Sequence, residues 1–238
     1  MNFFKKIRMI VLCSLLSTAA YAGAVEEKIN KHINTIFGMG EVVDSVSRTD
    51  YSGLYEVVMN NGEIIYTDEK TSFIIQGNIV DTRTRKDITK NRMIQISQEP
   101  IDFSKLPLEK AMKEVRGNGE RVLVTFEDPN CMYCKQFLKE FADVDNVTLY
   151  TFIYPILGED SQKKSRDIWC AEDRLKSWKD WMYKDIAPES ANCNISELGK
   201  NYDLGMSLKI RSVPTLFFAD GSRLSGFIPA NIVENGLK

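Results

Sequence analysis

A chain of 238 residues has room for one large domain or two modest ones. Hydrophobic residues make up 43% of it and charged residues 27%, values that are ordinary for a protein with a packed core and that exclude a disordered chain. The formal net charge is only −2 and no basic stripe dominates the sequence, so we expect no nucleic-acid partner.

Residues 1–22 have the layout of a cleavable signal peptide. Basic residues precede an apolar run over 9–16, and the A-x-A sequence at 20–22 is typical of a cleavage site. A second A-x-A sequence lies next to it, at 22–24. An uncleaved membrane anchor is the alternative, but the run is shorter than the roughly 20 residues that cross a bilayer. We therefore expect an exported protein that begins near Gly23.

Cleavage changes two counts. The leader holds Lys5, Lys6 and Arg8 but no acidic residue, so Lys and Arg fall from 31 to 28 against 33 Asp and Glu, and the mature net charge is about −5. Cys13 leaves with the leader, which reduces the cysteines from five to four. An even number of cysteines in an exported chain is typical of a compartment that permits disulfides.

Residues 23–90 are predicted to form a small β-rich domain. A helix comes first, because apolar residues recur there at helical spacing. These residues are Ile29, Ile33, Ile36 and Phe37. Strand-like segments at 55–59 and 63–67 flank an Asn-Asn-Gly sequence at 60–62, and an Asn-Gly step supplies the positive φ angles of a tight hairpin turn. Residues 73–77 continue the sheet as a third strand.

So small a sheet has few ways to cover its edges, and pairing with a second copy of the chain is one of them. The domain contains no cysteine. We therefore expect it to be a dimerisation or docking element rather than a catalytic one.

Residues 91–119 are predicted to link this domain to the next. Pro100 and Pro107 interrupt the segment, and a short amphipathic helix is expected after Pro107. Its apolar face would consist of Leu108, Ala111, Met112 and Val115. The Gly-Asn-Gly sequence at 117–119 ends it. We expect the helix to pack against the following domain.

Residues 120–238 are predicted to form an α/β domain. The apolar run at 122–126 is typical of a strand buried on both faces, and a polar turn leads from it into the C-x-x-C sequence at 131–134 and a helix. The remaining elements follow in chain order. They are a second buried strand at 148–154, helices at 161–185 and 194–207, and a closing hairpin at 216–224.

The spacing of Cys131 and Cys134 indicates redox chemistry. Cys131 would begin the helix, where unsatisfied N–H groups and the helix dipole favour a thiolate and lower its pKa. Cys134 lies one turn further on the same face and points inward, so it can attack a mixed disulfide and release the substrate. Cys131 is therefore predicted to attack and Cys134 to resolve.

Two alternatives for this pair are weaker. A zinc site needs four ligands, but Cys170 and Cys193 are far apart and His32, the only histidine, is in the other domain. A purely structural disulfide between Cys131 and Cys134 would close too small a loop to stabilise much. We expect no metal and no cofactor.

The run at 122–137 is similar to the active site of the thioredoxin superfamily. The sequence at 212–215 resembles the superfamily's cis-proline loop, which lies beside the active cysteines. A cis bond between Val213 and Pro214 would leave the neighbouring backbone free to hydrogen-bond an extended substrate chain. The alternative for Pro214 is an ordinary proline at the start of a strand.

The similarity extends to the DsbC/DsbG group of periplasmic disulfide isomerases and covers nearly all of the mature chain. Segments 66–68 and 75–77 resemble its N-terminal dimerisation domain, and 168–171 with Cys193 resembles its second, non-catalytic disulfide. The resemblance implies an α+β N-terminal dimerisation domain followed by an α/β thioredoxin-like domain with a helical insertion.

The same resemblance implies function and partners. A V-shaped homodimer would hold misfolded exported proteins in a cleft between two catalytic domains. A membrane thiol reductase of the DsbD type would keep Cys131 and Cys134 reduced. A structural disulfide between Cys170 and Cys193 would stabilise the fold by about 3 kcal/mol in the chain-entropy model.

The chain departs from the family at several positions around the cysteines. Met132 and Tyr133 lie between them where the best-known isomerases have glycine and tyrosine, and Val213 precedes the proline where many have threonine. Thr125 occupies the position at which thioredoxin itself has a buried acid. Glu127 is a possible substitute, although a solvated carboxylate in the turn is the preferred interpretation.

Disulfide isomerisation in exported proteins of the periplasm is the function that the sequence favours. One alternative with the same chemistry is a DsbG-like reductase that protects single cysteines from oxidation. Another is a dimeric chaperone in which the cysteines are incidental. A strong oxidase is less favoured, because oxidases of this superfamily are usually monomers without an N-terminal β domain.

Overall fold

The computed structural model describes residues 23–38, 40–51 and 53–237, so the predicted signal peptide lies outside the described residues. The chain divides into two compact units, with the division between Met93 and Ile94. No helix in the described ranges is long and apolar enough to cross a membrane. Each unit has its own hydrophobic core.

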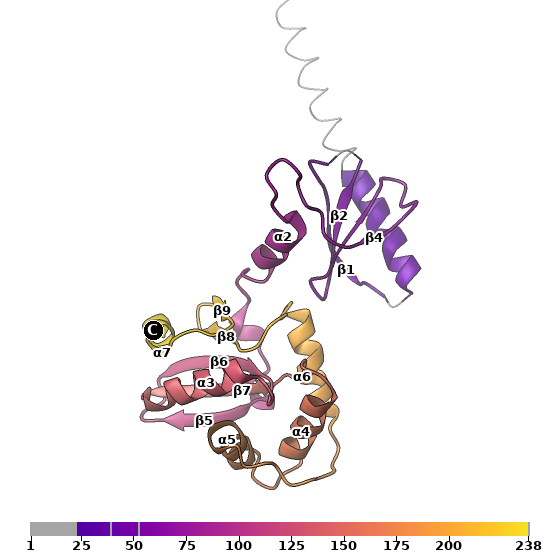
Figure 1. Ribbon diagram of the computed structural model, residues 1–238. Coiled ribbons are helices and arrows are strands. Elements are labelled where there is room, and N and C mark those ends of the chain that lie inside the picture. Colours follow the sequence, from indigo (N-terminus) through magenta and orange to yellow (C-terminus); the bar gives the residue numbers. More distant parts are fainter. Residues whose placement is uncertain (1–22, 39, 52, 238) are drawn as a thin grey trace, which may run out of the picture. The chain divides into compact units, whose positions relative to one another are not determined.

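The N-terminal unit packs one helix on a four-stranded antiparallel sheet (Figure 1). The helix covers residues 23–37. The strands are in sequence order: β1 (Val43–Arg48), β2 (Tyr55–Met59), β3 (Ile64–Thr67) and β4 (Ile75–Gln76). Helix α2 (Ile88–Ile96) follows and spans the division between the units.

The predicted hairpin is confirmed. Its turn is closed by a hydrogen bond from the Gly62 N–H to the Met59 carbonyl at 2.7 Å, and Gly62 has φ +75°. Ile29 and Ile33 of the first helix are buried against the sheet, as their spacing predicted. Ile36 and Phe37, which were expected on the same face, are exposed.

Two features of this sheet differ from the prediction. The third predicted strand is shorter, since only Ile75 and Gln76 pair with β3. Strand β1 was not predicted, because its sequence alternates small and polar residues with little apolar content. It is held by antiparallel pairing with β2, in which Val46 lies opposite Val57.

The second unit contains a five-stranded mixed sheet with the order β5-β7-β6-β8-β9. Its strands are β5 (Met112–Arg116), β6 (Arg121–Glu127), β7 (Val147–Ile153), β8 (Thr215–Phe218) and β9 (Arg223–Ser225). Strands β6 and β7 are parallel, and the other neighbours are antiparallel. The predicted closing hairpin is confirmed as β8 and β9.

Helices cover this sheet, as Figure 1 shows. They are α3 (Met132–Glu140), α4 (Glu159–Trp169), α5 (Arg174–Lys184), α6 (Ser196–Ser207) and α7 (Ala230–Gly236). Three short 3₁₀ turns complete the unit, η1 (Phe103–Lys105), η2 (Leu108–Lys110) and η3 (Phe141–Asp143). Helix α5 packs on α3 and β5, and α6 packs on β7. The predicted fold class is confirmed, with α4, α5 and α6 as the helical insertion between β7 and β8.

The helix predicted after Pro107 is wrong. Only the single turn η2 forms, and the backbone is extended from Ala111 onward. Residues Met112–Arg116 form the edge strand β5 instead, paired antiparallel with β7. Their side chains follow a period of two, since Met112 and Arg116 face inward while Val115 is exposed. Pairing with the free edge of β7 therefore outweighs the local helical spacing.

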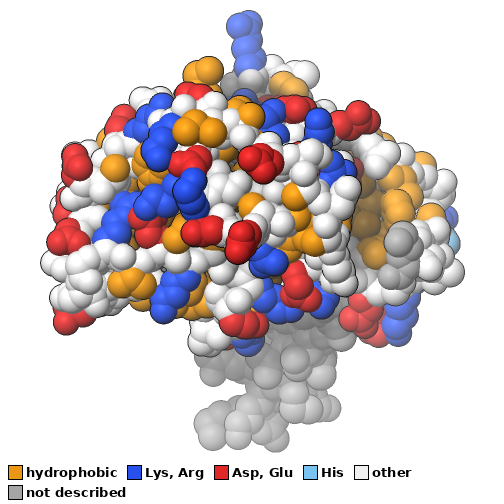
Figure 2. Space-filling view, turned by 90° about the horizontal axis from the view of Figure 1, so that it is seen from below, with side chains coloured by type: hydrophobic (Ala, Val, Ile, Leu, Met, Phe, Trp, Pro, Cys, Tyr) orange, Lys and Arg blue, Asp and Glu red, His pale blue; other side chains and the backbone are white. Residues whose placement is uncertain are grey.

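The long helix predicted at 161–185 is two helices. Helix α4 ends at Trp169, and α5 begins at Arg174 after Asp173, whose side chain caps it by accepting a hydrogen bond from the Lys176 N–H at 2.9 Å. On the face drawn in Figure 2, basic and acidic side chains are interspersed. Ion pairs of this kind lie within α5, where Asp180 contacts both Lys176 and Lys184.

Aromatic rings fill the centre of this core. Phe126 of β6 stacks on Phe152 of β7 with ring centroids 4.8 Å apart, and its edges meet Tyr154 and Phe217. Strand β6 is thus fixed on both sides at the point where it ends in the turn before α3.

Candidate active site

The turn between β6 and α3 is held by one buried carboxylate. Asp128 accepts hydrogen bonds from the backbone N–H of Asn130 at 2.7 Å and of Leu157 at 2.9 Å, and from the Ser161 hydroxyl at 2.7 Å. Its own carbonyl accepts from the Cys131 N–H at 3.0 Å. The contacts with Asn130 and Cys131 close the turn, and those with Leu157 and Ser161 tie it to the start of α4 and the segment before it, so the position of Cys131 is fixed.

Cys131 is the N-cap of α3. Its backbone is extended, and its sulfur accepts a hydrogen bond from the Cys134 N–H at 3.1 Å. Both thiols are free, with Cys131 4% exposed and Cys134 completely buried. The predicted arrangement, one sulfur at the leading end of a helix and a second one turn inside, is present in the structure.

The two thiols have opposite electrostatic environments. The pKa of Cys131 is lowered, first because the Cys134 thiol donates to it and then because the Cys134 backbone N–H does the same, against the opposing effects of burial and of the Asp128 charge. The pKa of Cys134 is raised, chiefly by burial. Cys131 is therefore the sulfur that can carry a negative charge, and Cys134 holds its proton.

The predicted proline loop lies beside the cysteines. The bond between Val213 and Pro214 is cis, and the Val213 carbonyl is 3.4 Å from the Cys131 sulfur. Val213 and Pro214 are buried immediately before β8. The structure thus brings together the two motifs that the sequence singled out.

The two residues between the cysteines project outward. Met132 is 79% exposed and Tyr133 57% exposed. The Tyr133 ring is 6.2 Å from that of Phe227, which follows β9 and is itself partly exposed. Phe227 was not predicted to belong to the site, because nothing in its local sequence connects it to α3. Met132, Tyr133 and Phe227 therefore provide exposed apolar surface near Cys131.

A groove runs along the exposed side of α3. Its lining includes Asn130, Met132, Lys135, Gln136, Trp181 and Asp185. Trp181 of α5 donates its indole N–H to the Pro129 carbonyl at 2.6 Å, and the Lys135 ammonium lies 3.7 Å from the centre of its ring. The groove therefore extends from beside Cys131 along α3 and is also lined by Trp181 and Asp185 of α5.

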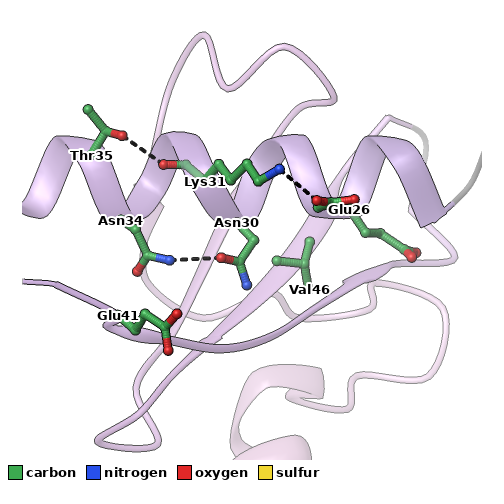
Figure 3. A pocket seen from close by; sticks show the side chains of 8 residues that line it. Glu26, Asn30, Lys31, Asn34, Thr35, Glu41 and Val46 are labelled. Atoms are coloured by element: carbon green, nitrogen blue, oxygen red, sulfur yellow. Dashed lines mark hydrogen bonds and ion pairs between the residues drawn. The ribbon is translucent and has the colours of Figure 1, made fainter.

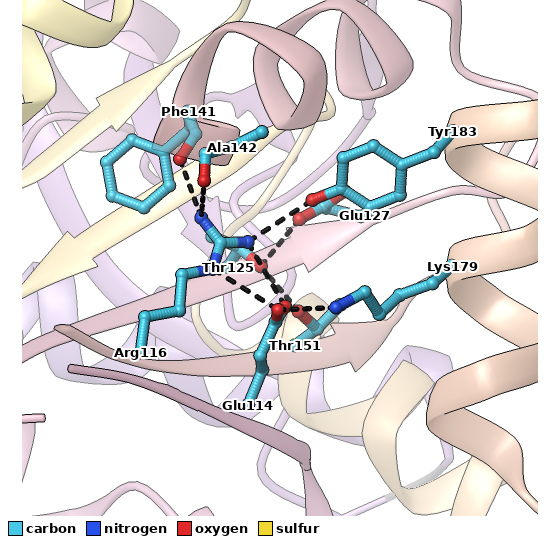
Figure 4. A network of polar contacts seen from close by, with 9 residues as sticks. All are labelled: Glu114, Arg116, Thr125, Glu127, Phe141, Ala142, Thr151, Lys179 and Tyr183. Carbon is cyan, nitrogen blue, oxygen red and sulfur yellow. Dashed lines mark hydrogen bonds and ion pairs between the residues drawn. The ribbon is translucent and has the colours of Figure 1, made fainter. Parts of the chain in front are cut away.

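Glu127 is not the solvated turn residue that was expected. It is the last residue of β6 and is fully buried. Its Oε1 accepts a hydrogen bond from the Thr125 hydroxyl at 2.7 Å, as Figure 4 shows. Burial raises the pKa of Glu127 to about 8, and the Cys131 charge adds to the effect while Arg116 opposes it. The sequence signal, a polar residue at the end of an apolar run, is ambiguous because a turn also begins there.

A disulfide joins Cys170, at the end of α4, to Cys193, in the segment before α6. The Cα atoms are 5.5 Å apart. The loop that it closes contains α5, and Cys131 and Cys134 are the free thiols of the described residues.

Other candidate sites give no comparable chemistry. Within the described ranges, no group of three His, Cys, Asp or Glu side chains is placed to hold a metal ion. Figure 3 shows a hollow beside the first helix. Its polar side chains are bound to each other, as in the contacts Lys31–Glu27 at 2.6 Å and Asn34–Asn30 at 2.7 Å. We assign it no ligand.

Two family models together cover most of the chain. The thioredoxin-like domain matches residues 108–238, and the disulfide bond isomerase protein N-terminal domain matches residues 20–90. A probable thiol:disulfide interchange protein DsbC of Bordetella pertussis is 43% identical over 213 residues, which are 90% of this chain and 73% of that protein. The thiol:disulfide interchange protein DsbC of Escherichia coli K12 is 26% identical over 217 residues, 89% of this chain and 88% of that protein.

A solved structure agrees with these matches. The crystal structure of a disulfide interchange protein from Neisseria gonorrhoeae aligns with a TM-score of 0.51 and 37% identity, over 55% of this chain and 98% of that one. The chain belongs to the DsbC family of thiol:disulfide interchange proteins.

Proposed function

We propose that this protein is a protein disulfide isomerase for exported proteins, in which Cys131 attacks and Cys134 resolves. The observation that supports this most strongly is the pair of opposed thiols at the start of α3. Cys131 accepts hydrogen bonds that favour its thiolate, whereas Cys134 is buried and protonated. Thiol–disulfide exchange requires a nucleophilic thiolate, and a second, withheld sulfur can then resolve the mixed disulfide.

The first step forms a mixed disulfide. The Cys131 thiolate attacks one sulfur of a wrong substrate disulfide, the S–S bond breaks, and the other substrate sulfur leaves as a thiolate. That thiolate can attack a second disulfide of the substrate and finally displace Cys131, which moves a bond without net oxidation. If no productive attack follows, the Cys134 sulfur displaces the substrate and forms the Cys131–Cys134 disulfide.

The surroundings of Cys131 fit a protein substrate. Met132 and Tyr133 offer exposed apolar surface next to the sulfur, and Val213 and Pro214 lie on its other side. We assign these four residues to substrate contact. Misfolded chains expose apolar segments, so a surface of this kind binds them without requiring a particular sequence.

Reactivation of scrambled ribonuclease tests the proposal. We expect the wild-type protein to restore activity, Cys131→Ser to restore none, and Cys134→Ser to accumulate mixed disulfides. Recovery by Cys131→Ser that equals the wild type would exclude the mechanism. The proteins that Cys134→Ser retains also separate two functions, since clients with many cysteines favour isomerisation and clients with one cysteine favour a protective reductase.

The N-terminal unit is proposed to form a homodimer. Strand β4 is an edge of its sheet, and both of its residues are exposed. Phe73 and Val80 add exposed apolar surface near it. An edge of this kind can pair with a second copy. Light scattering should give a dimer for the wild type and a monomer for Ile75→Asp, and a dimer in both would locate the interface elsewhere.

Export and electron supply complete the proposal. We place the mature protein in the periplasm after cleavage behind Ala22, and a membrane thiol reductase of the DsbD type is proposed to keep Cys131 and Cys134 reduced. N-terminal sequencing of the protein from a periplasmic extract should begin at Gly23. Alkylation of that extract should find both thiols reduced, and oxidised thiols would instead indicate an oxidase.

A further inference from the structure

Trp181 of α5 is bound to the turn that leads into the attacking cysteine. Its indole N–H donates to the Pro129 carbonyl at 2.6 Å. The next N–H along the chain, that of Asn130, donates to the Asp128 carboxylate at 2.7 Å. The peptide group between Pro129 and Asn130 is therefore held at both of its ends, immediately before Cys131.

The same indole ring is in contact with α3 itself. The Lys135 ammonium lies 3.7 Å from the centre of the ring and pairs with Asp185 at the end of α5. The Lys135 backbone N–H donates to the Cys131 carbonyl at 3.1 Å, which is the first hydrogen bond of the helix. Trp181 thus contacts a residue of the turn before Cys131 and the residue that closes the first helical turn after it.

Helix α4 adds to these contacts. The Lys164 ammonium lies 5.0 Å from the centre of the Trp181 ring and pairs with Asp160. Asp160 also accepts a hydrogen bond from the Asn130 side chain at 2.7 Å. Helices α4 and α5 therefore both hold the segment that precedes Cys131.

The position of Cys131 determines which form of its thiol is favoured. As the N-cap of α3, it has an extended backbone that directs its sulfur to the Cys134 N–H at 3.1 Å. The titratable groups that act on it are Cys134 of α3, Asp128 of the turn and Glu127 at the end of β6, and the proline loop contributes a backbone carbonyl. Trp181 carries no charge, so it can act on Cys131 only through the geometry of the turn and the helix.

We propose that Trp181 is a positioning residue that holds Cys131 at the N-cap of α3 and thereby favours its thiolate. The inference rests on the proposed function, because it concerns the step in which Cys131 attacks. Without the indole N–H, the Pro129 carbonyl loses its partner and the turn can move, which weakens the contact between the Cys131 sulfur and the Cys134 N–H. A thiolate that loses part of a hydrogen bond is less favoured relative to the thiol.

Trp181→Phe tests this, because it removes the indole N–H, keeps an aromatic ring beside Lys135 and changes no charge. The rate at which the reduced protein attacks dithiobis(nitrobenzoate), measured against pH, gives the midpoint of Cys131 ionisation and the rate of the full thiolate. We expect the midpoint of the variant to lie about 0.5 pH unit above that of the wild type.

The two rate profiles should also cross. Well below both midpoints the variant should react about twofold more slowly than the wild type, because less of its Cys131 is ionised. Above both midpoints it should react about 1.7-fold faster, because a thiolate of higher pKa is the stronger nucleophile. A loss of folded protein would lower the rate at every pH and cannot produce this crossing.

Trp178→Phe is the matched control. Trp178 lies in the same helix and is buried in the core of the unit. The same substitution there should lower stability through lost packing but should leave the midpoint and the full thiolate rate unchanged.

The wild-type protein offers a second measurement that needs no variant at position 181. If Trp181 affects the ionisation of Cys131, the ionisation of Cys131 must affect the contact of Trp181 to the same extent. The NMR resonance of the Trp181 indole N–H, assigned by elimination with Trp169→Phe and Trp178→Phe, should therefore shift with the midpoint of Cys131. The shift should be absent in Cys131→Ser.

The outcomes are distinct. A Trp181→Phe profile that coincides with the wild type, or an equal midpoint shift in Trp178→Phe, would overturn the inference. If Trp181→Phe does not fold, an indole resonance of Trp181 that does not follow Cys131 would overturn it, and one that follows Cys131 would support it. A wild-type Cys131 that does not attack the reagent would instead contradict the proposed function on which the inference rests.

Discussion

The Cys131 sulfur lies 3.4 Å from the carbonyl oxygen of Val213, a residue 82 positions further along the chain. The same sulfur accepts a hydrogen bond from the Cys134 N–H at 3.1 Å. The carbonyl favours the protonated thiol and the N–H favours the thiolate, so the two contacts act against each other. The balance between the thiol and thiolate forms of Cys131 thus depends on both the helix that carries it and the proline loop beside it.

Cys131 should ionise below the range of a free thiol, whose ordinary pKa is 9.0. The rate of alkylation by iodoacetamide as a function of pH measures this directly, with Cys131→Ala providing the background. Cys134→Ala removes the thiol donor that lowers the Cys131 pKa most, so its midpoint should lie higher than that of the wild type. Identical profiles would mean that Cys134 does not stabilise the thiolate.

Glu127 should make the second unit less stable as pH rises. Its pKa is about 8 in the folded protein against an ordinary 4.5, so the folded state keeps a proton that the unfolded chain releases. The stabilisation is complete below the lower value and is lost as pH rises through the higher one, by on the order of 5 kcal/mol in total.

Unfolding by guanidinium chloride, followed by tryptophan fluorescence, reports on this unit alone because all three tryptophans lie in it. Glu127→Gln cannot titrate. As pH rises from 4.5 to about 8, the free energy of unfolding of the wild type should therefore fall relative to that of Glu127→Gln. A constant difference between the two proteins would show that Glu127 is ionised at its ordinary pKa.

Much of the site was visible in the sequence because its signals are local. A helix that begins at Cys131 follows from the strand and turn before it, and the hairpin at Gly62 follows from a turn that needs a positive φ. Glu127 was misjudged because one residue separates the buried end of a strand from a solvated turn. Its burial involves residues distant in sequence, since Arg116 of β5 and Tyr183 of α5 lie near it (Figure 4). Strand β5 was missed for a related reason, since its pairing partner β7 is distant in sequence.

The disulfide between Cys170 and Cys193 should stabilise the second unit by about 3 kcal/mol, since it closes a loop with a sequence separation of 23. The double variant Cys170→Ala/Cys193→Ala should show this loss in guanidinium unfolding and should keep the reactivity of Cys131. Reductant should lower the stability of the wild type to that of the variant and leave the variant unchanged. Equal stabilities without reductant would assign the bond a role other than stabilisation.

Two glycines of α6 provide a matched test of the packing behind the active site. At Gly205 an added Cβ would lie 2.4 Å from the ring of Tyr154, the residue that follows β7. That ring has little freedom to move, because its hydroxyl donates to the Ile210 carbonyl at 3.1 Å and its edge meets Phe126. Gly199, by contrast, is exposed and has open space around the same position.

Alanine should therefore have opposite effects at the two positions. Gly199→Ala should stabilise the unit by up to about 1 kcal/mol, because alanine loses less backbone entropy in a helix. Gly205→Ala has the same intrinsic advantage, but the collision with Tyr154 should reverse it and destabilise the unit by about 1–3 kcal/mol. Guanidinium unfolding of both variants measures the difference. Stabilisation by both would mean that α6 does not approach Tyr154 as closely as the structure places it.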